Sequence, residues 1–197
     1  MKKIYLILMH TNTIPSKLVK FFTRYKYSHV AISLDKNCDT IYSFGRRKVN
    51  SILNGGFVIQ KKQDDFFKKF DKTTCRIYEL DVNEEQYKDV KNILDNMRLN
   101  PSKYKYDFIG IIPRFLGTPF TIKNRYVCSY FVADILEKAK IYKFNKKTYF
   151  VKPKDFETIQ DSKQIYSGLY MTYMVNEIIK KLSNWAFIMW KFMLKID

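Results

Sequence analysis

The order of elements along the chain predicts an α+β fold, in which helices pack on a small antiparallel sheet. Two observations carry this prediction. Short apolar or alternating segments, typical of strands, fill much of the first 82 residues, and longer segments with helical periodicity follow from residue 83 onward. With 197 residues, 46% of them hydrophobic, the chain can bury one substantial core. We therefore expect one domain with an appended C-terminal segment.

Strand-like segments dominate the first part of the chain. Polar turn formers, Asp35, Asn37 and Asp39, separate two of these segments and predict an antiparallel hairpin. Pro15 opens a short stretch with helical character at residues 16–22. The predicted strands are 4–9, 27–34, 40–44, 57–60 and 75–82.

Helical segments dominate the second part. Asn83 is a good N-cap, and Glu84 and Glu85 follow it in the first turn, where the helix dipole favours acids. This helix should end near Leu99, before Pro101. The other predicted helical segments are 64–70, 104–112, 125–140 and a short one from Pro153.

The C-terminal segment has a different composition. It is rich in Trp, Met and aliphatic residues, and its longest uncharged run, 182–190, has nine residues, against about 20 for a membrane-spanning helix. We predict a domain at 1–163 and a hydrophobic or amphipathic helical extension at 164–197. Two interpretations stay open: the helix packs on the domain or on a second copy in a homo-oligomer, or residues 165–195 lie on an anionic membrane surface.

The chain is strongly basic. It has 36 Lys and Arg against 19 Asp and Glu, a formal net charge of +17. Such a charge predicts attraction to nucleic acid, anionic lipid or acidic polymers. The basic residues are spread along the chain, with no block typical of a nucleic-acid-binding arm. Nucleic acid is therefore the less favoured partner.

The chain start and the cysteines bear on the compartment. The first nine residues resemble the start of a signal peptide, but their apolar run is only six residues long and no cleavage site follows it. Cys38, Cys75 and Cys128 form an odd, widely spaced set without a C-x-x-C pair. This favours a reducing compartment over a disulfide framework or a zinc site. We expect a cytoplasmic protein, peripheral at the inner face of the membrane where its C-terminal segment binds lipid, and no metal or cofactor.

Cys128 is the candidate nucleophile. It lies in the first turn of the predicted helix 125–140, where unpaired backbone N–H groups and the helix dipole lower the pKa of a thiol. The same N–H groups can hold the oxyanion of a tetrahedral intermediate, and Arg125 adds positive potential. The alternative is a buried structural cysteine. Cys128 heads an apolar stripe: Phe131, Val132, Ile135, Leu136 and Ala139.

His29 is the candidate base. In the strand 27–34 it shares a face with Ala31 and Ser33, whose small side chains leave room for a helix to approach. A histidine at the edge of such a face can take the proton of a neighbouring thiol. His10 ends its strand before a polar loop, and we expect it to be solvated.

Three segments carry a resemblance to a known family. Residues 26–35 (KYSHVAISLD), 41–45 (IYSFG) and 126–136 (YVCSYFVADIL) are similar to the circularly permuted NlpC-type papain-like superfamily. Lecithin:retinol acyltransferase-like enzymes belong to this group, in which the histidine strand precedes the cysteine helix. The resemblance covers about residues 3–160 and leaves the C-terminal segment unexplained.

The resemblance implies a papain-like fold with Cys128 as nucleophile and His29 as base. Ser43 takes the place of the third polar group, where relatives often have an acid or a histidine; a serine can orient the imidazole but does not stabilise imidazolium as a carboxylate would. The implied reaction cleaves an amide, ester or thioester of a lipid or peptide-like substrate through an acyl-enzyme, which water or an acceptor resolves.

Two other classes stay open. The missing acid suggests a catalytically inactive papain-like binding module. The charge of +17, with 16 Phe and 15 Tyr, suggests a basic membrane-binding or nucleic-acid-binding protein.

Overall fold

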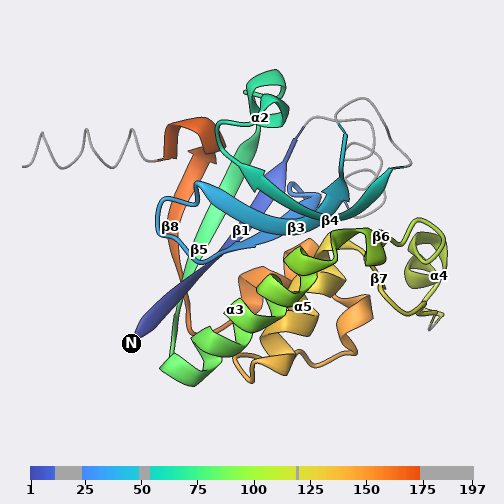
Figure 1. The fold of residues 1–197 in the computed structure, drawn as a ribbon. Coiled ribbons are helices and arrows are strands. Elements are labelled where there is room, and N and C mark those ends of the chain that lie inside the picture. Colours follow the sequence, from blue (N-terminus) through green and yellow to red (C-terminus); the bar gives the residue numbers. More distant parts are fainter. Residues whose placement is uncertain (12–23, 49–53, 119, 174–197) are drawn as a thin grey trace, which may run out of the picture.

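A computed structural model describes residues 1–11, 24–48, 54–118 and 120–173 (Figure 1). They form one curled sheet of eight strands in the order β7-β6-β4-β3-β2-β1-β5-β8. Neighbouring strands are antiparallel except β6 and β7, which are parallel. The α+β class is confirmed, although the sheet is larger than predicted and mixed. The strands are β1 (Lys2–His10), β2 (His29–Ser33), β3 (Thr40–Arg46), β4 (Gly55–Lys61), β5 (Thr74–Val82), β6 (Lys105–Tyr106), β7 (Arg125–Tyr126) and β8 (Ser162–Leu169).

The two longest helices in the described part of the chain lie against one face of the sheet (Figure 1). The longer one begins as predicted: the Asn83 side chain accepts a hydrogen bond from the Gln86 N–H, and the Gln86 side chain accepts one from the Asn83 N–H. The α-helices are α2 (Asp65–Lys69), α3 (Glu84–Leu99), α4 (Ile111–Phe115) and α5 (Cys128–Lys138). The 3₁₀ helices are η1 (Pro101–Lys103), η2 (Thr148–Phe150), η3 (Pro153–Thr158) and η4 (Tyr170–Thr172).

The sheet separates two hydrophobic clusters. On one face, Val30, Ile32 and Phe44 pack with residues of α3 and α5. On the other face, Ala31 and Ile41 pack with residues of α2 and η4. The prediction that the small residues of strand 27–34 receive the cysteine helix is therefore wrong. The larger residues Val30 and Ile32 receive it, because the helix gains more buried apolar area against branched side chains.

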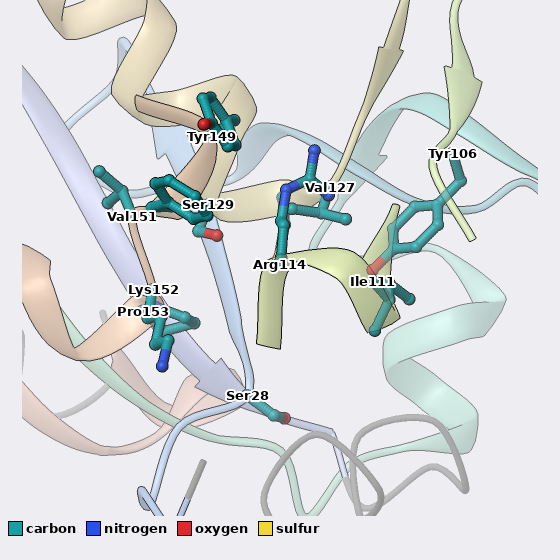
Figure 2. A pocket seen from close by; sticks show the side chains of 12 residues that line it. Ser28, Tyr106, Ile111, Arg114, Val127, Ser129, Tyr149, Val151, Lys152 and Pro153 are labelled. Atoms are coloured by element: carbon teal, nitrogen blue, oxygen red, sulfur yellow. The ribbon is translucent and has the colours of Figure 1, made fainter. Parts of the chain in front are cut away.

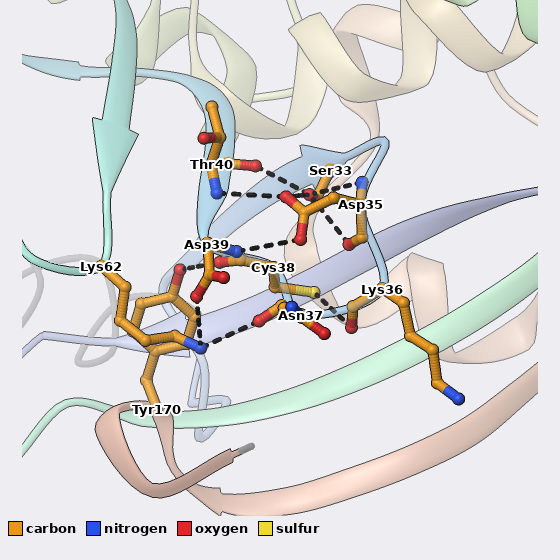
Figure 3. A network of polar contacts seen from close by, with 9 residues as sticks. All are labelled: Ser33, Asp35, Lys36, Asn37, Cys38, Asp39, Thr40, Lys62 and Tyr170. Atoms are coloured by element: carbon orange, nitrogen blue, oxygen red, sulfur yellow. Dashed lines mark hydrogen bonds and ion pairs between the residues drawn. The ribbon is translucent and has the colours of Figure 1, made fainter. Parts of the chain in front are cut away.

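A polar network closes the turn between β2 and β3 (Figure 3). The Asp35 carboxylate accepts hydrogen bonds from the Ser33 hydroxyl and the Thr40 N–H. Cys38 lies in this turn with a left-handed φ of 52°, and its carbonyl accepts a 2.6 Å hydrogen bond from the Tyr170 hydroxyl. The turn thus ties the β2–β3 hairpin to the end of the described chain, and Cys38 is a structural residue within it.

Pairing between distant segments changes two predicted helices. The sequence predicts a helix over 104–112, but the backbone N–H of Lys105 donates to the Asn124 carbonyl and the backbone N–H of Asp107 donates to the Tyr126 carbonyl. This pairing makes 105–106 and 125–126 short strands, so α4 begins only at Ile111 and α5 begins at Cys128. Cys128 is therefore the first residue of its helix.

The predicted helical extension is wrong at its start. Residues 162–169 form β8, which pairs with β5 at the sheet edge, so the boundary between 163 and 164 falls inside a strand. Residues 174–197, with most of the predicted lipid-binding segment, lie outside the described part, as does the predicted helix at 16–22. Within the described residues, no helix has the length and apolarity required to cross a membrane.

Candidate functional site

Cys128 borders a cavity of about 70 Å³ at the N-terminus of α5 (Figure 2). Its side chain is almost completely buried, at 6% exposure. Five segments form the walls: Ser28 before β2, the end of β6, α4, the start of α5 and the chain from η2 to η3. The lining residues are Ser28, Tyr106, Ile111, Arg114, Val127, Cys128, Ser129 and residues 149–153.

Two opposing effects act on the Cys128 thiol. Burial raises its pKa, while hydrogen bonds from the backbone at Val30 and Ser129 and the charge of Arg114 act to lower it. Burial is the larger effect, so the pKa of Cys128 lies above the ordinary value. The start of the helix lowers the pKa of the Cys128 thiol as predicted, but burial raises this pKa by more. The resting group at neutral pH is the thiol, and a nucleophilic role requires a base.

The thiol meets β2 beside His29. The β2–β3 ladder is paired at Ile32 and Tyr42, and closer to His29 the backbone of Val30 makes different bonds. Its N–H hydrogen-bonds to the Cys128 sulfur, and its carbonyl accepts a 2.7 Å hydrogen bond from the Ser43 hydroxyl. Two of the three predicted site residues, Cys128 and Ser43, therefore both hydrogen-bond to Val30. Val30 directly follows the third predicted residue, His29.

The His29 ring lies over Gly45. Its Cε1 atom is 3.7 Å from the position that a Cβ atom on Gly45 would occupy. The alternation of the strands places this ring on the Ala31 face of the sheet, whereas the thiol comes from the Val30 face. The two groups thus approach β2 from opposite faces, where the β2–β3 ladder is no longer paired.

Ser43 does not take the role of orienting His29. Its hydroxyl proton is donated to the Val30 carbonyl. The cross-strand neighbour of His29 is Gly45, two residues further along β3, and glycine has no side chain to offer. Burial alone lowers the pKa of His29, to about 4. The imidazole is therefore neutral at pH 7 and able to accept a proton.

The half-buried His29 makes stability depend on pH. A histidine that titrates near 6.5 when unfolded and near 4 when folded binds more protons in the unfolded state between these values. The contribution of His29 to the free energy of unfolding is therefore complete above pH 6.5. It falls by about 3 kcal/mol as the pH decreases towards 4. Urea unfolding at pH 7 and 4.5 should show a smaller loss for His29→Gln than for wild type. An equal loss in both would contradict the lowered pKa.

His10 lies on the face of α5 and is buried, at 8% exposure. The prediction that it is solvated is wrong, because it continues the inward alternation of Ile4, Leu6 and Leu8 along β1. Its Nδ1 atom is 3.4 Å from the Ser28 hydroxyl oxygen. Since Ser28 lines the cavity, this residue separates His10 from it. The alternation was readable in the sequence.

No pattern in the sequence predicts the buried ion pair between Arg114 and Asp107. Asp107 is fully buried, and its carboxylate accepts a 3.1 Å hydrogen bond from Arg114 and a 2.9 Å hydrogen bond from the Gly110 N–H. Residues 107–118 looked like the end of a helix and a loop, so nothing marked Arg114 as buried. Among the described residues, no cluster of His, Cys, Asp and Glu could hold a metal ion.

Comparisons with protein-family models and with curated proteins find no match: no family model matches the chain, and no curated protein is significantly similar to it.

Proposed function

We propose that this protein is a cysteine-dependent hydrolase or acyltransferase, with Cys128 as nucleophile. The observation that carries the proposal is the position of the thiol: first residue of α5, beside a cavity, and hydrogen-bonded to the residue next to a neutral histidine. The resemblance of residues 26–35, 41–45 and 126–136 to the permuted NlpC-type papain-like superfamily supports it. That resemblance favours a lipid or peptide-like acyl substrate, and the charge of +17 favours one held on an anionic surface.

The proposed reaction has two steps. The Cys128 sulfur adds to the carbonyl carbon of an amide, ester or thioester as its proton passes to His29, whose ring must first turn from the Ala31 face of β2 to the face of the thiol. The tetrahedral intermediate then collapses with release of the leaving group, which takes that proton. Water or an acceptor amine or hydroxyl then attacks the thioester, releases the acyl group and returns the proton to sulfur. The N–H groups at the start of α5 supply the oxyanion with hydrogen bonds.

The pair is a neutral thiol and a neutral imidazole at rest. The raised pKa of Cys128 and the lowered pKa of His29 both disfavour the thiolate–imidazolium form. With Gly45 in place of a third polar group, imidazolium gains no partner there. We therefore expect a slow enzyme whose rate rises with pH as the thiolate becomes accessible.

Alkylation of the three cysteines tests the proposal. Cys38 and Cys75 are fully buried, and burial raises the pKa of Cys75 to about 12 and that of Cys38 as well. At pH 7.5, iodoacetamide should modify Cys128 at least about a hundredfold faster than either, because only Cys128 borders the cavity and only Cys128 has a base in the proposed mechanism. The rate at each cysteine is followed by mass spectrometry of peptides.

The two histidines serve as matched controls. His29→Gln should slow the alkylation of Cys128 about tenfold or more, whereas His10→Gln should change it less than about threefold. The reverse result would make His10 the base, acting through Ser28. Equal, slow alkylation of all three cysteines in wild type would refute the catalytic proposal and leave a papain-like binding module.

A further inference from the structure

We propose that the cavity beside Cys128 recognises a carboxylate of the acyl substrate through Arg114 and Tyr149. This inference rests on the proposed function and narrows its substrate class to acyl groups that carry a carboxylate near the scissile carbonyl. It is argued from the polar groups that line the cavity, their burial and the size of the space.

Arg114 lines the cavity and carries donors without a partner in the described part of the chain. Its side chain is 10% exposed, and one guanidinium nitrogen, Nη2, is bound to the fully buried Asp107. The guanidinium also lies over the Tyr130 ring, 5.5 Å from its centre. These two contacts hold the group in place. Its other nitrogens, Nε and Nη1, are buried without a hydrogen-bond partner among the described residues.

Tyr149 supplies a further donor from another wall. It lies in η2, is 7% exposed, and its hydroxyl is also buried without a partner in the described structure. Figure 2 shows both side chains on the cavity, Arg114 from α4 and Tyr149 from η2. Buried donors of this kind are nearly always satisfied in folded proteins, so donors from two walls of one small cavity indicate a polar ligand.

The size and charge of the cavity favour a carboxylate. Its 70 Å³ is about half the volume of an engineered cavity that binds benzene, which is enough for a carboxylate. Arg114 is balanced by Asp107, but the start of α5 adds a partial positive charge, and Lys152 also lines the cavity. Apolar side chains such as Ile111, Val127 and Pro153 complete the walls and strengthen each hydrogen bond inside.

Two alkylating reagents that differ in one group test the inference. Iodoacetate and iodoacetamide transfer a carbon to sulfur with loss of iodide, but only iodoacetate carries a carboxylate. We take the iodoacetate-to-iodoacetamide rate ratio at Cys128 and divide it by the same ratio for glutathione, both at pH 7.5. The recognition of a carboxylate should make this quotient about ten or more, since one charge-assisted hydrogen bond corresponds to about a tenfold preference.

Two conservative variants identify the donors. Arg114→Lys keeps a cation beside Asp107 but lacks the planar fork of donors, and Tyr149→Phe removes only the hydroxyl. Each should lower the quotient, by about tenfold and about threefold. The matched controls are Arg76→Lys, at an arginine paired with Glu157, and Tyr25→Phe, at a second buried hydroxyl. Neither control residue lines the cavity, so both should leave the quotient unchanged.

The outcomes separate this inference from the proposed function. A Cys128 that reacts rapidly with iodoacetamide, but with a quotient near one or with no effect of Arg114→Lys and Tyr149→Phe, overturns the inference and leaves the nucleophile in place. If Cys128 reacts with neither reagent, the proposed function fails. The cavity is then tested by melting temperature in acetate against chloride at equal ionic strength. Stabilisation by acetate that Tyr149→Phe reduces supports the recognition of a carboxylate, and no difference overturns it.

Discussion

Asp107→Asn is expected to destabilise the protein by about 3–5 kcal/mol, because it leaves the buried guanidinium of Arg114 without its counter-charge. Asp107 is fully buried, and its carboxylate also holds the Gly110 N–H at the start of α4. The measurement is urea unfolding at pH 7. A loss of this size is a large part of the total stability of a typical domain, so α4 and the cavity wall should loosen with it.

A surface ion pair provides the control. Lys91 pairs with Asp95 one turn later on α3, and both side chains are about half exposed. Asp95→Asn should therefore cost less than about 1 kcal/mol. The double variant Asp107→Asn, Arg114→Gln should recover part of the loss of Asp107→Asn, because it removes the uncompensated charge. A loss below about 1 kcal/mol for Asp107→Asn alone would show that Arg114 reaches solvent or another acceptor.

Phe131→Ala by itself is expected to lower the free energy of unfolding by about 3–5 kcal/mol, as other large-to-small changes of buried aromatic residues do. Phe131 is fully buried on α5, and its ring contacts Phe44 at 5.0 Å, Phe57 at 5.8 Å and Tyr126 at 6.4 Å between ring centres. This cluster joins β3, β4 and β7 to the helix one turn below Cys128. Its loss removes apolar contact and leaves a cavity.

The same unfolding measurement checks this prediction. Phe131→Leu, which keeps most of the volume, should cost about 1–2 kcal/mol. Phe120→Ala, at a phenylalanine that is 39% exposed, should change stability by less than about 1 kcal/mol. Equal effects at Phe131 and Phe120 would mean that the aromatic cluster does not hold α5 on the sheet. The alkylation rate of Cys128 should fall in Phe131→Ala, because the start of the helix loses its support.

Local signals explain the parts of the fold that were predicted. Period-two alternation and polar turns mark the β2–β3 hairpin, and the Asn83 cap with acids in the next turn marks α3. Each of these signals acts between residues a few positions apart. The strands β6, β7 and β8 were missed because their evidence is a partner far along the chain: 105–106 pairs with 125–126, and 162–169 pairs with 74–80.

The sequence by itself determined the α+β class and the candidate nucleophile, since Cys128 at a helix start and His29 on an earlier strand are both local patterns. Only the tertiary structure decided which face of β2 receives the helix, that Gly45 rather than Ser43 lies across from His29, and that Arg114 is buried beside the cavity. Alternation shows which residues share a face, but it does not show what covers that face. The pKa of Cys128 depends on that covering, because the burial that raises it is created by segments distant in the chain.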